Sequence, residues 1–138
     1  MDVVIVTPRY AKEKPSNKMG VAVIKQALKE ENIKVKIYAL DEFNPSKLKR
    51  KSIVGYSSFY EHLDASLESA KKIKGHFVVF GGQGIYHDET NKRLIESGAI
   101  HALNYGHAKP FINCVKRRKE GNLGKIAEEE GLITKNQL

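Results

Sequence analysis

The stretch "FVVFGGQG", residues 77–84, ends an apolar run in three glycines within four residues. Four consecutive apolar residues, from Phe77 to Phe80, are typical of a strand that is buried on both faces of a sheet. Glycine at the exit of such a strand either allows a turn with positive φ or lets another group approach the backbone closely. The segments on either side of this stretch decide which kind of sheet contains the strand.

Strands and helices alternate along the chain. Apolar runs predict strands at 2–7, 33–40, 52–58, 76–80 and 99–104. Helical periodicity predicts helices at about 18–31, 61–73 and 90–95, and a last helix from Pro110 onward. Thr90 is expected to cap the third of these helices. Such alternation indicates a parallel sheet covered by helices on both faces. Apolar and charged residues alternate over 33–40, which places that strand at an edge. We therefore predict a three-layer, doubly wound α/β domain with a five-stranded parallel sheet in the order 2-1-3-4-5, the flavodoxin-like or Rossmann-like arrangement.

Length and composition are those of one globular domain. The chain has 138 residues, of which 41% are hydrophobic. We expect residues 1–121 to form the domain and residues 122–138 to form a helical tail or linker. Because no apolar run approaches the roughly 20 residues needed to span a membrane, no membrane role is expected. The single cysteine, Cys114, excludes an internal disulfide and suits the reducing cytoplasm, where we expect the protein to be found. Because Cys114 lies on the apolar face of the last predicted helix, we expect its thiol to be buried in the core.

The net charge is +8, and basic residues gather at 47–51, 71–74 and 116–119. This charge favours polyanionic partners, including nucleic acid, although no motif that reads nucleic acid accompanies it. The five histidines show no spacing typical of a metal site. His76 and His101 begin or interrupt predicted strands, so we expect them to have structural roles.

A ligand of a doubly wound sheet binds outside the carboxyl ends of its strands, near the point where the strand order reverses. The loops predicted at that edge are rich in hydroxyls, aromatic rings and glycines, and nearly free of acids. A phosphoryl-accepting aspartate is absent, since the third strand ends in Ser57 and Ser58, and no G-x-G-x-x-G follows the first strand. These loops suit a large flat ligand or a partner protein better than catalysis. No catalytic or metal-binding residue is therefore predicted, and whether the chain is an enzyme stays open.

Four segments in this order carry a resemblance: "PSNKMGVAVIKQALKEENIKVKIYALDEF" (15–43), "IVGYSSFYEHLDASLESAKKIK" (53–74), "FVVFGGQGIY" (77–86) and "ALNYGHAKPFINCV" (102–115). Over about residues 1–120 the chain resembles the cobalamin (B12)-binding domain, most closely the version that precedes the core of radical S-adenosylmethionine enzymes. The resemblance implies that cobalamin is the cofactor and that a radical S-adenosylmethionine-type protein is the partner. Because the chain contains no C-x-x-x-C-x-x-C, it is not expected to hold an iron–sulfur cluster itself.

The resemblance also implies particular site residues. The family's Ser-x-Leu element looks like Ser57-Ser58-Phe59, and its paired glycines look like Gly81-Gly82. The family's Asp-x-His-x-x-Gly motif falls on residues 15–20, where Gly20 is kept but Asn17 stands in place of the histidine that binds cobalt. We therefore expect cobalamin to bind with neither its own base nor a histidine on the cobalt. The full set of candidate cofactor-binding residues is Tyr10, Asn17, Gly20, Tyr56, Ser57, Ser58, Phe59, Gly81, Gly82, Gln83, Gly84, Tyr105, Gly106 and His107.

Three alternatives remain open at this point. The chain could be a degenerate binding domain that no longer holds cobalamin and acts beside a radical S-adenosylmethionine-type partner. The chain could be an interaction domain without a cofactor, which meets a protein or a nucleic acid through its basic surface. It could also be a small enzyme that uses the serine, histidine and tyrosine side chains of the same loops, although no acid–base pair supports this.

Overall fold

The computed structural model describes residues 2–7, 19–48, 51–57, 62–82 and 88–137. Within these ranges the strands are β1 (Asp2–Thr7), β2 (Val35–Ala39), β3 (Ser52–Ser57), β4 (Phe77–Gly81), β5 (Ala102–Asn104) and β6 (Ile133–Thr134). The helices are α1 (Met19–Glu30), α2 (Leu63–Ala70), α3 (Asp88–Glu96), α4 (Lys109–Lys116) and α5 (Leu123–Glu129). Asn32, at φ 59°, follows α1 in the left-handed conformation that commonly ends a helix.

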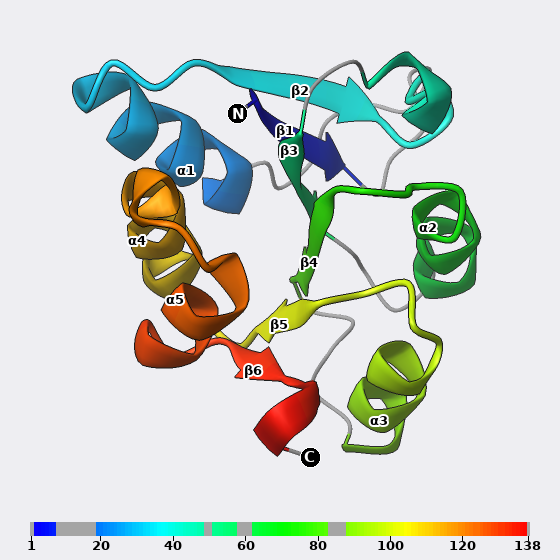
Figure 1. Ribbon diagram of the computed structural model, residues 1–138. Helices are drawn as coiled ribbons and strands as arrows, with labels where there is room; N and C mark the ends of the chain where they lie inside the picture. Colours follow the sequence, from blue (N-terminus) through cyan, green and yellow to red (C-terminus); the bar gives the residue numbers. More distant parts are fainter. Residues whose placement is uncertain (1, 8–18, 49–50, 58–61, 83–87, 138) are drawn as a thin grey trace.

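The strands form one sheet in the order β2-β1-β3-β4-β5-β6 (Figure 1). The first five run parallel in the predicted order, which confirms a doubly wound α/β fold with β2 at the edge. The prediction of five strands was wrong, because β6 adds a sixth strand that is antiparallel to β5. A strand of two residues is too short to produce an alternating sequence pattern, so periodicity could not reveal it.

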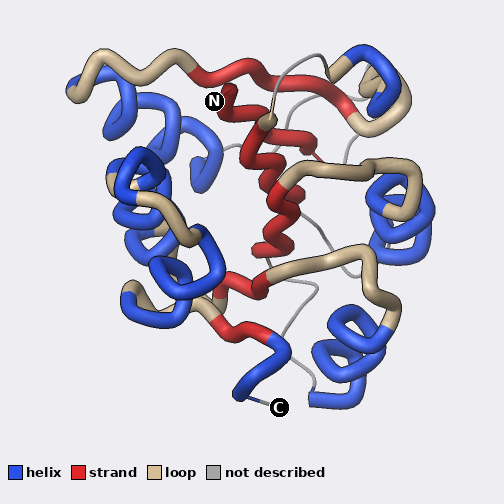
Figure 2. Tube along the Cα trace, in the orientation of Figure 1, coloured by secondary structure: helices blue, strands red, loops and turns tan. Residues whose placement is uncertain are grey.

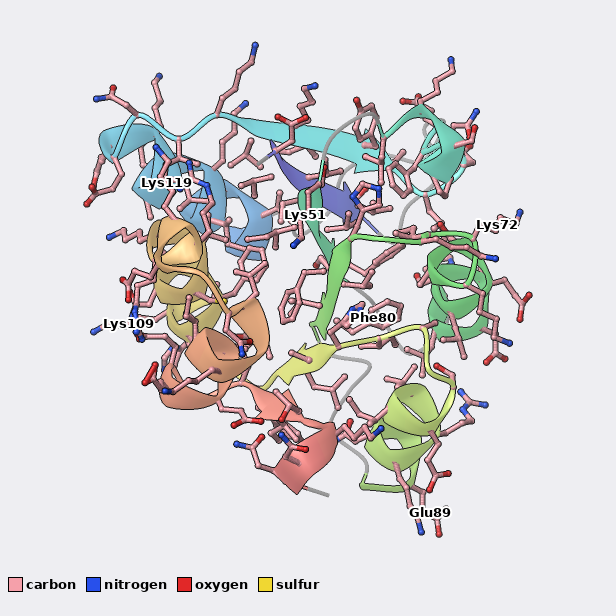
Figure 3. All side chains as sticks on the ribbon, viewed as in Figure 1. Lys51, Lys72, Phe80, Glu89, Lys109 and Lys119 are labelled. Carbon is pink, nitrogen blue, oxygen red and sulfur yellow. The ribbon has the colours of Figure 1, made fainter. Side chains whose placement is uncertain are left out.

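Helices cover both faces of the sheet. In Figures 1 and 2, α1, α4 and α5 lie on one side and α2 and α3 on the other. Successive side chains of a strand point to opposite faces of the sheet. Ile5 and Val79 pack under α1 and α4, whereas Val6 and Phe80 pack under α2 and α3. Phe80 is visible between the sheet and the helices of the second face in Figure 3. The central strands read as continuous apolar runs because both of their faces are buried.

The segment predicted as a tail or linker packs onto the first face of the sheet. Its buried residues Leu123, Ile126, Ala127 and Leu132 belong to the same core as α1 and α4. Arg117, just after α4, forms ion pairs with two carboxylates of the segment, Glu129 at 3.1 Å and Glu130 at 2.9 Å. Burial of several large side chains gives these residues a fixed place on the sheet.

Two further predictions concern single residues. Thr90 was predicted to cap the third helix, but α3 begins at Asp88 and Thr90 lies inside it. Cys114 is buried in the core as expected, and burial raises the pKa of its thiol to about 11.

Of the helices described, the longest has 12 residues, and none has the length and apolar character needed to cross a membrane.

Candidate functional site

A pocket opens at the carboxyl ends of β3, β4 and β5, on the face that α1 and α4 cover. Its floor consists of two rows of residues that strand pairing places side by side. The deeper row is Ile5, Gly55 and Val79, and the outer row is Ser57, Gly81 and Asn104. Each row contains one glycine, so each lacks a side chain at its middle position. The pocket is the space that remains over Gly81 and beside the side chains that cover Gly55.

The walls come from the two helices. Ile24 of α1 and Phe111 of α4 line opposite sides, and Ala108 and His107 lie where the chain enters α4. A Cβ atom built at Gly55 would lie 3.0 Å from Cζ of Phe111 and 3.1 Å from Cδ1 of Ile5. Gly55 therefore lets the Phe111 ring lie close to the sheet, and this ring sets the depth of the pocket.

Asn104 fixes the rim of the pocket. Its Oδ1 accepts a hydrogen bond of 3.2 Å from the backbone N–H of Phe111, and its Nδ2 donates one of 3.0 Å to the backbone carbonyl of His107. The first contact satisfies one of the N–H groups that the start of α4 leaves free. Because Asn104 is only 6% exposed and both ends of its amide are engaged, it serves to position α4 and the turn before it.

Gly81 and Gly82, at the end of β4, require glycine for two different physical reasons. Gly82 has φ 102°, a conformation that other residues rarely adopt, so the chain turns there. Gly81 shows no such φ, and a Cβ atom at this position would lie 3.5 Å from Cβ of Asn104, an ordinary contact distance. The glycine at 81 therefore leaves space in the pocket, and the glycine at 82 permits the turn.

The pocket is small and largely apolar. Its volume is about 160 Å³. An engineered apolar cavity of about 150 Å³ in another protein binds benzene, so the space is that of one aromatic ring. Among the described lining residues, His107 is the one that carries an imidazole ring. No group of three or more potential metal ligands occurs among the described residues.

Six of the predicted site residues line this pocket: Tyr56, Ser57, Gly81, Gly82, Gly106 and His107. Tyr56 contributes its backbone, since its ring packs 4.8 Å from that of Phe80 on the other face of the sheet. Its hydroxyl contacts Oγ of Ser69 at 2.7 Å, and burial raises the pKa of the phenol. The Tyr56 side chain therefore belongs to the core.

Tyr105 is described but does not line the pocket. Its hydroxyl accepts a hydrogen bond from Nδ2 of Asn91, which links the turn before α4 to α3. Gly20 lies in the first turn of α1, the helix from which Ile24 reaches the pocket. The predicted residues Tyr10, Asn17, Ser58, Phe59, Gln83 and Gly84 lie outside the described residues.

Sequence reasoning missed three residues that shape the site: Gly55 and Asn104 on the strands and Phe111 on α4. Gly55 carried a usable signal, because a glycine inside a buried strand often marks a place where another group approaches the backbone. Asn104 ends its strand just before a glycine turn, and a short polar side chain there is typical of a helix or turn anchor. Phe111 carried no signal beyond its apolar character, since pattern alone does not distinguish a pocket wall from core.

Comparisons with known proteins do not assign the chain to a family. No protein-family model matches the chain, and no curated protein matches it. Among solved structures, a flavodoxin from the domain Archaea aligns over 94% of this chain and 99% of its own, with 18% sequence identity and a TM-score of 0.35. At this level of similarity the alignment carries no argument about the site, and the strand order itself defines the fold as flavodoxin-like.

Proposed function

We propose that this protein is a cofactor-binding module that holds an aromatic group of its ligand in the pocket over Gly81, and that the ligand is cobalamin. The observation that carries the proposal is the pocket itself: Gly81, at the centre of the row Ser57, Gly81 and Asn104, leaves a space beside the Phe111 ring at the edge where doubly wound folds bind ligands. The sequence resemblance supplies the identity of the ligand.

The residues present fit the organic part of cobalamin. The pocket has the volume of a six-membered ring, its walls are Ile24 and Phe111, and a methyl group at Gly81 would fill part of it. These features suit one ring of the benzimidazole base that ends the nucleotide tail, with the rest of the tail passing out through the mouth. Gly81, Ser57 and Asn104 would lie along that mouth.

Cobalamin supplies the cobalt chemistry when it is bound, and this chain supplies binding and orientation. Apolar walls favour an uncharged ring over water because such burial removes apolar surface from solvent. The fixed Asn104 amide keeps the pocket open by holding α4 at a set position above the sheet. Pre-organisation of this kind lowers the entropic cost of binding.

The proposal is tested with a matched pair of corrinoids. Hydroxocobalamin carries the nucleotide tail, whereas cobinamide has the same ring system and lacks the tail. We expect the wild-type protein to change the visible spectrum of hydroxocobalamin and to gain thermal stability with it, and we expect cobinamide to do neither. Equal binding of the two corrinoids would place recognition outside the pocket, and no binding of either would reject the proposal.

Substitutions at Gly81 locate the contact. Gly81→Ala and Gly81→Val add one and three carbons to the pocket, so affinity for hydroxocobalamin should fall stepwise. Ala65→Val serves as the control, because it adds carbons at an exposed position of α2, on the opposite face of the sheet. Unchanged affinity in a folded Gly81→Val protein would show that the ligand does not occupy this space.

A further inference from the structure

Two histidines occupy equivalent places at the opposite, amino-terminal edge of the sheet. His76 immediately precedes β4, and its Nδ1 accepts a hydrogen bond of 3.0 Å from the backbone N–H of Ser52. His101 immediately precedes β5, and its Nδ1 accepts one of 3.0 Å from the backbone N–H of Val78. Each histidine lies beside the residue that donates this hydrogen bond to it. In both cases the position is one residue before the first paired residues of the two strands.

These contacts fix the proton on the outer ring nitrogen. A nitrogen that accepts a hydrogen bond carries no proton, so a neutral imidazole in this position is protonated at Nε2. Nε2 is separated from Nδ1 by Cε1, so its N–H points away from the neighbouring strand whose backbone N–H contacts Nδ1. Within the described part of the chain, neither Nε2 has a hydrogen-bond partner. Each histidine thus presents a donor whose orientation the backbone holds.

Both histidines line one groove. The groove has a volume of about 690 Å³, and its lining includes His76, Phe77, His101 and Lys51. A second hollow of about 510 Å³ adjoins it and shares Phe77, His101, Asn122 and Gly124 with it, so the two form a continuous surface. The His101 ring stacks on Phe77 with 5.1 Å between ring centres.

The groove is positively charged. Lys51 lines the first hollow, and Lys125 and Lys135 line the second. Figure 3 shows Lys51 over the central strands. Glu128 is the acid among the lining residues that the structure describes, and its carboxylate already accepts hydrogen bonds from Thr134 Oγ1 (2.6 Å) and Asn136 Nδ2 (2.9 Å).

We propose that this groove binds a phosphate group, with the Nε2–H donors of His76 and His101 and the Lys51 ammonium contacting its oxygens. Oriented donors beside ammonium groups suit an anion that only accepts hydrogen bonds, and the flat Phe77–His101 stack suits a base attached to the phosphate. The phosphate could belong to a free nucleotide or to a nucleic acid strand. Because the groove lies at the other edge of the sheet from the pocket, the two proposals stand or fall separately.

Imidazole ¹⁵N NMR tests the proposal directly. At pH 8, the spectra of both histidines should show a proton on Nε2, and adding adenosine monophosphate should shift both Nε2 signals. A short single-stranded oligonucleotide, tested in parallel, distinguishes the sources of phosphate: tighter binding that weakens steeply with salt indicates a strand, and binding no tighter than that of the mononucleotide indicates a free nucleotide. Absence of an Nε2 shift with both probes would overturn the proposal.

Asparagine separates the ligand role of these histidines from their structural role. His76→Asn and His101→Asn keep an acceptor near the position of Nδ1 and remove the outward donor. The double variant should keep its thermal stability and lose roughly tenfold or more in affinity for the probe that binds the wild type, as expected for the loss of hydrogen bonds to an anion. Lys51→Gln should also weaken binding. Lys36→Gln, which removes the same charge from β2, should leave it unchanged; an equal loss in Lys36→Gln, or full affinity in the double histidine variant, would contradict the proposal.

Discussion

At the scale of single residues, three glycines near the pocket have three different physical causes. Gly55 lets the Phe111 ring approach the sheet, Gly81 leaves empty space, and Gly82 allows a turn with positive φ. All three read alike in the sequence, because a glycine shows the absence of a side chain but not the reason for it.

This difference predicts opposite outcomes for one kind of substitution. Gly55→Ala should lower the free energy of unfolding by about 1–3 kcal/mol, because the new methyl group would overlap Phe111 in a packed core. Gly81→Ala should change it by less than about 1 kcal/mol, because the methyl group enters open space at an ordinary contact distance. Urea unfolding of the two variants measures both values. A Gly81→Ala protein as destabilised as Gly55→Ala would contradict the described pocket.

His101 predicts a pH dependence of stability. Burial of the ring lowers the pKa of His101 below that of a free histidine, so the unfolded chain binds the proton more tightly than the folded chain does. The contribution of neutral His101 to the free energy of unfolding is therefore fully present above the pKa of a histidine in the unfolded chain, about 6.5. This contribution is lost as the pH falls below that value. Protonation of Nδ1 would also remove the hydrogen bond from Val78.

The measurement is thermal unfolding between pH 8 and pH 5, with His101→Asn as the comparison. The melting temperature of the wild type should fall more steeply with acid than that of the variant. Parallel curves for the two proteins would show that His101 does not contribute to the pH dependence.

At the scale of elements, the C-terminal segment carries its own prediction. Leu132 precedes β6, is 1% exposed and packs in the core with α1 and α4. Leu132→Ala should therefore lower the free energy of unfolding by about 2–5 kcal/mol, the range for buried leucines. Lys135→Ala, three residues further along at an exposed position, should have little effect. A neutral Leu132→Ala in denaturant unfolding would show that this segment does not pack as described.

The sequence was informative about elements whose pattern extends over several residues. The alternating charges of 33–40 placed β2 at an edge, and the apolar runs at 2–7, 52–58 and 77–80 placed β1, β3 and β4 in the centre. β6 could not be predicted, because a strand of two residues is too short to show an alternating pattern. Of the site, the loops and glycines could be located from topology, but the walls could not. Phe111 lines the pocket only because Asn104 holds α4 in place, a contact between side chain and backbone that leaves no pattern in the sequence.

At the scale of the whole molecule, the two edges of one sheet offer different chemistry. The carboxyl edge has an apolar, ring-sized pocket between the sheet and α1 and α4, whereas the amino-terminal edge has a basic groove with two oriented imidazoles. β6 extends the sheet, and α5 and β6 both help to form the groove at the second edge, since Lys125 and Thr134 line it. An anionic ligand and an aromatic cofactor group could therefore be bound at the same time.

The central claim is that the pocket over Gly81, beside the Phe111 ring, receives an aromatic group of cobalamin. Backbone amide NMR during titration with hydroxocobalamin tests this most directly, because it reports which residues the ligand meets. The account predicts that the amides of Ser57, Gly81, Gly82 and Phe111 shift together, while those of Ser52 and Val78 at the opposite edge stay in place. Shifts concentrated at Ser52 and Val78, or no shifts at saturating corrinoid, would contradict it.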